Sequence, residues 1–203
     1  MKILTAGDFH GSEELKQGVV DELEERDYDL LLMIGDYGSE EFYEDLVGSV
    51  NTPYLGTTGN WDFGFEPPEN NELDKLFNYQ KVEFKGYSFL LLGSVYPDDF
   101  MEQAKEFFED VPNEKRVVAS HYPPHMLGDL ADNGNRAGFA EFRELVMREK
   151  PALWVCGHIH EDYGKFSLMN TTVLNTAGEK SGKGWRVEMG EEGVEDVEEV
   201  KLD

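Results

Sequence analysis

Short apolar runs separated by amphipathic stretches are the feature of this sequence that most limits its possible folds. Residues 30–34, Leu-Leu-Leu-Met-Ile, are as apolar as a strand that is buried on both faces. Residues 2–6 precede a stretch in which Leu15 and Val19 share one helical face, and Ser12 is placed to cap that helix. This alternation is typical of βα units and predicts an α/β fold whose first part is a largely parallel sheet.

The later sequence favours hairpins and further strands. Residues 82–84 and 87–92 are joined through Lys85-Gly86 and have the pattern of a β-hairpin. Helices are expected at residues 99–108 and 137–148, and consecutive antiparallel hairpins over the last forty or so residues. Because no linker rich in Pro, Gly or Ser divides the chain, we expect one domain, residues 1–203.

The charge and the cysteine content limit the cellular environments and the binding partners that are possible for this chain. The 43 acidic residues outnumber the 18 basic ones, and a net charge of −25 repels long nucleic acids and anionic membranes over a screening length of about 8 Å. The single cysteine, Cys156, excludes an internal disulfide and a multi-cysteine zinc site. The start of the chain lacks the apolar core of a signal peptide, and no stretch approaches the ~18 apolar residues of a membrane span. We therefore expect a cytoplasmic, acidic protein with no membrane partner, whose surface also suits a salt-rich cytoplasm. The sequence does not determine the oligomeric state.

Five polar clusters each follow a predicted strand, and together they hold four of the five histidines in the chain. Ligands bind outside the carboxyl ends of the strands in open α/β sheets, so clusters from distant parts of the sequence can converge there. The clusters are Asp8-Phe9-His10, Gly35-Asp36, Gly59-Asn60-Trp61-Asp62, Ser120-His121 and Gly157-His158-Ile159-His160.

The side chains of these clusters form a coherent set of metal donors. Carboxylate, amide and imidazole groups without thiolate suit divalent ions such as Mn²⁺, Fe²⁺ or Zn²⁺. Each cluster alone is an ordinary turn or helix cap, whereas all five in one order, each after a strand, favour a metal site. The clusters thus offer carboxylates, an asparagine amide and four histidines as candidate donors.

In order and type, the clusters resemble the motif series of the calcineurin-like metallophosphoesterases: Asp-x-His, Gly-Asp, Gly-Asn-His-Asp/Glu, a lone His and Gly-His-x-His. The resemblance runs from Asp8 to His160, and the chain is similar to the small archaeal and bacterial phosphodiesterases related to the Icc type. It implies an α/β (α+β) metallophosphoesterase sandwich, in which two packed mixed β-sheets are flanked by helices.

The same resemblance implies a dinuclear centre, with Mn²⁺ expected and Fe, Zn, Ni or Mg as alternatives. Asp36 would bridge the two ions. One ion would be held by Asp8, His10 and His160, and the other by Asn60, His121 and His158.

The implied activity is hydrolysis of a small phosphodiester or nucleotide by a hydroxide that bridges the metals. Hydrolysis of phosphomonoesters or dinucleoside polyphosphates is the alternative within the same chemistry. A non-catalytic, metal-binding scaffold for protein interactions is the alternative from another class. A nuclease is disfavoured because the chain lacks a basic patch for long nucleic acids.

One position departs from the family pattern. Trp61 stands where the family usually has the histidine that protonates the leaving group, and an indole does not titrate near neutral pH. Substrates with good leaving groups are therefore expected. His125 is a candidate replacement proton donor, and Asn60, Trp61 and Arg136 are candidate substrate contacts.

Overall fold

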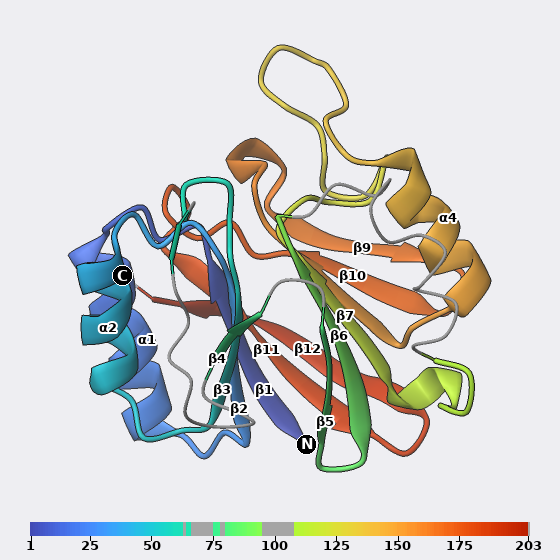
Figure 1. Ribbon diagram of the computed structural model, residues 1–203, viewed down its shortest axis with the longest axis horizontal. Helices are drawn as coiled ribbons and strands as arrows, with labels where there is room; N and C mark the ends of the chain where they lie inside the picture. The colour runs from blue at the N-terminus through green and yellow to red at the C-terminus, as the bar shows by residue number, and fades with distance from the viewer. Residues whose placement is uncertain (63, 66–74, 78–79, 95–107, 203) are drawn as a thin grey trace.

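The computed structural model describes residues 1–62, 64–65, 75–77, 80–94 and 108–202. Within these residues the chain forms two β-sheets that pack face to face, with helices on their outer faces (Figure 1). This is the α/β sandwich that the sequence predicted. None of the helices in the described ranges combines the length and the apolar character needed to span a membrane.

The first sheet is antiparallel on the side of the two C-terminal strands and parallel across the rest, whereas the second has a parallel centre and an antiparallel pair at each edge. The first sheet contains, in spatial order, β12 (Gly193–Lys201), β11 (Lys183–Gly190), β1 (Lys2–Gly7), β2 (Leu30–Ile34), β3 (Tyr54–Thr57) and β4 (Lys75–Phe77). The second contains β5 (Gln80–Phe84), β6 (Tyr87–Gly93), β7 (Arg116–Ser120), β8 (Leu153–Cys156), β10 (Thr171–Asn175) and β9 (Gly164–Leu168). The helices are α1 (Glu13–Glu25), α2 (Glu40–Gly48) and α4 (Ala140–Glu149), with 3-10 turns η2 (Asn113–Lys115) and η3 (His160–Asp162). The helix predicted at residues 99–108 lies outside the described residues except for its last position.

The strand directions confirm the predicted hairpins and add one parallel pair. β5 and β6 are antiparallel, as are β9 and β10, and β11 and β12. β10 also pairs in parallel with β8, although the sequence of the last forty residues indicated only antiparallel strands. This pairing aligns the carboxyl end of β10 with those of β7 and β8.

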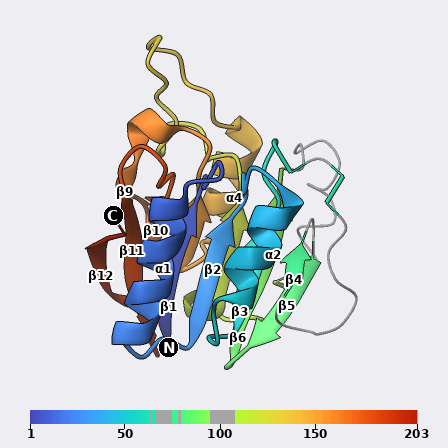
Figure 2. The same ribbon diagram turned by 90° about the vertical axis from the view of Figure 1, so that its left-hand side faces the viewer.

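The apolar run in β2 reflects burial on both of its faces. Leu30 and Leu32 belong to the core between the two sheets, together with Phe89 of β6 and Val155 of β8. Leu31, the residue between them, faces the opposite way because side chains alternate along a strand. It packs into the second cluster, which α1 and α2 cover (Figure 2).

On the outer face of the second sheet, α4 packs through Phe142 and Val146. The helix begins three residues later than the start predicted at residue 137. The cause is local: the Ala137 amide donates to the Asp129 carbonyl, and the Phe139 amide donates to that of Pro123. These bonds hold residues 137–139 out of the helix.

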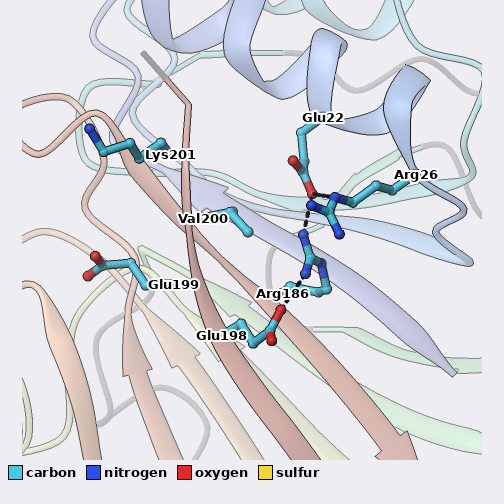
Figure 3. A pocket seen from close by; sticks show the side chains of 7 residues that line it. All are labelled: Glu22, Arg26, Arg186, Glu198, Glu199, Val200 and Lys201. Carbon is cyan, nitrogen blue, oxygen red and sulfur yellow. Dashed lines mark hydrogen bonds and ion pairs between the residues drawn. The ribbon is translucent and has the colours of Figure 1, made fainter.

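An ion network ties α1 to the β11–β12 hairpin (Figure 3). Arg186 of β11 donates to a Glu22 carboxylate oxygen at 2.8 Å and to the Tyr28 hydroxyl at 2.9 Å, and it also pairs with Glu198 of β12. Arg26 lies 3.4 Å from the same Glu22 carboxylate. Because these charges pair with one another, we read the network as a structural tie between a helix and a sheet edge.

Candidate metal centre

The predicted ligands come together at the carboxyl ends of the parallel strands of both sheets. They form two groups of donors, and within each group the donor atoms lie within 4.8 Å of one another. The groups are Asp8 with His10 and His160, and Asp36 with His121 and His158. Asn60 stands with the second group, because its Oδ1 is 2.8 Å from Nε2 of His121. The grouping matches the division that the family resemblance implied.

One carboxylate lies between the two groups. Asp36 Oδ2 is 3.6 Å from Nε2 of His10 and 3.4 Å from Nε2 of His121. Asp36 is almost fully buried, so its position between the two groups is not that of a mobile surface side chain. Its carboxylate therefore lies close to both donor groups.

The residues present fit a bound cation. Nε2 of His10 and Nε2 of His160 face each other at 3.3 Å, and the latter atom is 3.3 Å from Asp8 Oδ1. Several lone-pair donors that converge in this way satisfy one another poorly but can share a divalent ion. Oxygen and imidazole donors without thiolate suit borderline and hard ions.

The backbone at the ligands is unusual. Asp8, His10, Asp36 and His158 have φ of 53°, 46°, 54° and 70°, in the left-handed region that non-glycine residues rarely adopt. Each such residue costs roughly 1–2 kcal/mol, so the surrounding structure must hold all four in place. Strain of this kind is typical of functional sites.

Two glycines let the carboxylates approach the loops of other strands. A Cβ atom on Gly59 would lie 2.0 Å from Asp36 Oδ1, and one on Gly157 would lie 2.1 Å from Asp8 Oδ2. Only glycine leaves room for these contacts. In return, the His158 amide donates to both carboxylate oxygens of Asp8 at 3.0 Å.

Burial and neighbouring charges set the protonation of the site. Burial raises the pKa of Asp36, with nearby His121 acting in the opposite direction. Burial and the neighbouring His121 lower the pKa of His158 to about 4. The hydrogen bond with Asp8 raises the pKa of His160 against the effect of burial. Near neutral pH His158 is therefore an uncharged imidazole with a lone pair available for a cation.

Asp62 organises the second and third clusters, a role that the sequence did not reveal. Its buried carboxylate accepts hydrogen bonds from the amides of Asp36, Tyr37 and Gly59 at 2.7–2.8 Å. The loop after β2 is thereby fastened to the loop after β3. The only signal was its place in the Gly-Asn-Trp-Asp cluster.

A cavity of about 480 Å³ opens over the two donor groups. Trp61 forms part of its wall, with 67% of its surface exposed and its ring edge-on to His10 at 5.1 Å between centroids. Glu179, which the sequence did not single out, also lies in the wall. The lining residues are His10, Asp36, Asn60, Trp61, His158, His160 and Glu179.

Two predicted site residues lie apart from both this cavity and the two donor groups. His125 and Arg136 belong to the loop between β7 and α4, which is drawn in yellow and projects from the molecule in Figure 1. Nδ1 of His125 is 3.3 Å from Asp129 Oδ2, and Arg136 donates to Asp129 Oδ1 at 2.6 Å. Both side chains contact the buried Asp129, so the structure does not bring them together with the predicted ligands.

Comparison with known proteins assigns the chain to a family. The family model described as calcineurin-like phosphoesterase matches residues 1–162, which include every predicted ligand. The chain belongs to the calcineurin-like phosphoesterase family. Members of this family use divalent metals, in agreement with the two Asp/His groups.

A curated relative and several solved structures are similar to this calcineurin-like phosphoesterase. UPF0046 protein K07C11.7 of Caenorhabditis elegans is 30% identical over 184 residues, which cover 74% of this chain and 63% of the relative. The chain thus spans less than two thirds of that protein's length.

The solved structures share the fold over nearly the whole chain. TT1561 of Thermus thermophilus has a TM-score of 0.71 at 14% identity, with 100% of this chain and 99% of that one covered. A novel archaeal phosphodiesterase has a TM-score of 0.58 at 13% identity, with 98% and 99% covered. Zinc-complexed Vps29 of Entamoeba histolytica has a TM-score of 0.54 at 13% identity, with both chains fully covered. At such identities these likenesses support the calcineurin-like phosphoesterase fold alone.

Proposed function

We propose that this protein is a phosphodiesterase that hydrolyses small phosphodiesters or nucleotides with two divalent ions, Mn²⁺ being the expected metal and Fe, Zn, Ni or Mg the alternatives. The observation that carries the proposal is the position of Asp36, whose Oδ2 lies within 3.6 Å of both His10 and His121. One buried carboxylate within reach of two donor groups could hold two ions side by side, as in two-metal phosphatase sites.

The residues divide between the two ions as the geometry groups them. A pair of divalent ions supplies Lewis-acid stabilisation of phosphoryl oxygens and lowers the pKa of a bound water. One ion would be held by Asp8, His10 and His160, the other by Asn60, His121 and His158, and Asp36 would be common to both.

The cavity selects for small substrates. Its volume of about 480 Å³ lies within the range of small-molecule pockets. The net charge of −25 opposes the approach of long polyanions, so nucleic acids are not expected as substrates. The exposed ring of Trp61 offers a surface on which an aryl group or nucleobase can stack.

The leaving group is the second element of specificity. Trp61 can donate a hydrogen bond through its indole nitrogen, but it supplies no proton near neutral pH. His125 contacts Asp129 instead of lining the cavity. We therefore favour diesters whose leaving groups depart without protonation, such as aryl phosphodiesters.

The test compares the parent protein with Asp36→Asn on bis-p-nitrophenyl phosphate in the presence of Mn²⁺. The parent should hydrolyse the diester and bind two ions, and the variant should lose at least about 100-fold in turnover with its thermal stability retained. Asp196→Asn is the matched control, because Asp196 is exposed on β12. Near-normal turnover by Asp36→Asn would contradict a shared carboxylate.

The same assay separates the alternatives. Faster hydrolysis of p-nitrophenyl phosphate or of a dinucleoside polyphosphate would replace the diester assignment with one of those activities. A parent protein that binds Mn²⁺ but hydrolyses none of these substrates would favour the metal-binding protein-interaction scaffold.

A further inference from the structure

The cavity wall is completed by a residue beyond the segment that the family model matches. Glu179 follows β10, and its Oε2 lies 3.1 Å from Nδ1 of His160. The other ring nitrogen of His160 faces the first donor group, 3.3 Å from Asp8 Oδ1. Nδ1 itself is buried and has no hydrogen bond among the described residues, so the contact with Glu179 has the length of a hydrogen bond without its full alignment.

Glu179 is held in place from both sides. The amide of Gly178 donates to the carbonyl of Gly7 at 2.9 Å, directly before Asp8. There is no space for a larger residue at position 178, because a Cβ would lie 2.9 Å from the Lys183 carbonyl oxygen. On the other side, Lys180 donates to Glu161 at 2.7 Å, next to His160 in the chain. The Gly178 bond thus fixes the backbone before Glu179 to the loop that carries Asp8, and the exposed Lys180–Glu161 pair adds a weaker contact beside His160.

We propose that Glu179 is a positioning residue, which accepts the Nδ1 proton of His160 and so presents Nε2 to the metal ion beside Asp8 and His10. A neutral imidazole has one proton, and an acceptor at Nδ1 leaves the Nε2 lone pair free for the metal. Carboxylates in this position also fix the orientation of the ring. The inference rests on the proposed function, because it concerns the same centre.

The charge balance of the cavity supports a specific role. Asp8 and Asp36 already bring two buried carboxylates to the site, and a third one at its wall adds repulsion in a protein of net charge −25. A hydrogen bond with His160 and the nearby Lys180 ammonium would offset that repulsion.

The test measures metal affinity directly. Mn²⁺ alone is titrated into the parent and into Glu179→Ala and Glu179→Gln. We expect the parent to bind two ions, and Glu179→Ala to bind one of them about 10- to 100-fold more weakly with the other unchanged. Glu179→Gln should lose less, because its amide oxygen still accepts a hydrogen bond from Nδ1. Glu191→Gln removes an equal charge from the β11–β12 turn, outside the cavity, and should match the parent.

A second readout identifies the proton itself. In the Zn²⁺-loaded parent with ¹⁵N-labelled histidine, His160 should show a protonated Nδ1 that exchanges slowly with solvent, and in Glu179→Ala this proton should exchange fast. The melting temperature of the metal-free variants should equal that of the parent.

Two results overturn the inference while leaving the proposed function intact. They are unchanged binding of both ions by Glu179→Ala, and equal losses for the Gln and Ala variants, which would indicate an effect of charge alone. A parent protein that binds no Mn²⁺ would instead overturn the proposed function and this inference together.

Discussion

At the scale of single residues, the centre is built from side chains that need special backbone geometry. Four predicted ligands adopt left-handed φ, and two glycines are placed where any Cβ would meet a carboxylate oxygen of Asp8 or Asp36. Such positions lower the stability of a fold, and they are typical of sites where function gains from them. Here the gain is the convergence of donor atoms from loops that are far apart in the sequence.

Trp61 provides a test of the leaving-group chemistry. Trp61→His should accelerate hydrolysis of diesters with poor leaving groups, because an imidazole at the cavity wall can donate a proton near neutral pH. Rates with bis-p-nitrophenyl phosphate should change little, since p-nitrophenolate departs unprotonated. Steady-state kinetics of the parent and of Trp61→His should be measured on methyl and p-nitrophenyl diesters. Trp61→Phe is the control, because its side chain does not titrate. Equal rates for the His and Phe variants on the methyl diester would show that the proton comes from elsewhere.

His158 predicts a pH dependence of the metal-free protein. Its pKa is lowered from 6.5 to about 4, so between these values the unfolded chain binds more protons than the folded one. The free energy of unfolding therefore falls as the pH is lowered through this window, by about 2 kcal/mol at pH 5 from this group. Urea unfolding at pH 7 and pH 5 should show a larger loss for the parent than for His158→Gln. Identical losses would mean that His158 titrates normally.

The candidate ligands could be selected from the sequence, but the residues that support them could not. His158 and His160 are two of only five histidines, and their spacing after an apolar run is a distinctive signal. Glu179 is one of 43 acidic residues, so its type carries no information. Its proposed role depends on the hydrogen bond between Gly178 and Gly7, which joins parts of the chain about 170 residues apart.

At the scale of secondary structure elements, local sequence patterns were sufficient to predict most strands. They were not sufficient to predict the order of the strands within each sheet. The hairpin of β5 and β6 could be predicted because its turn, Lys85-Gly86, lies between an alternating segment and an apolar one. The parallel pairing of β10 with β8 could not, because it follows from packing of Val173 beside Trp154 and not from any turn.

The end of α4 offers a prediction about stability. Lys150 follows the helix with φ 45° and ψ 52°, and its amide donates to the Val146 carbonyl, a conformation that favours glycine. Lys150→Gly should raise the free energy of unfolding by about 0.5–1 kcal/mol, because it removes the left-handed strain of a residue with a Cβ. Thermal and urea unfolding would measure the gain. Lys150→Ala keeps the strain, and an equal gain for that variant would contradict the explanation.

At the scale of the whole molecule, charge dominates. A net charge of −25 on 203 residues destabilises the folded state through self-repulsion, and dissolved salt screens this effect. The melting temperature should therefore rise by several degrees between low salt and molar KCl. Sucrose at the same osmolality serves as the control, since it stabilises without screening. A melting temperature that does not respond to KCl would contradict the self-repulsion.

The order of strands has a consequence for how the protein is made. β1 pairs with β2 on one side and with β11 on the other, where Ile3 is opposite Val187. About 180 residues separate these two partners, so a nascent chain carries β1 with one open edge for roughly 10–40 s of translation. All seven predicted ligands leave the ribosome before that edge is closed. A nascent chain in a metal-rich compartment could therefore meet its ions before the sheet that is to hold them is complete.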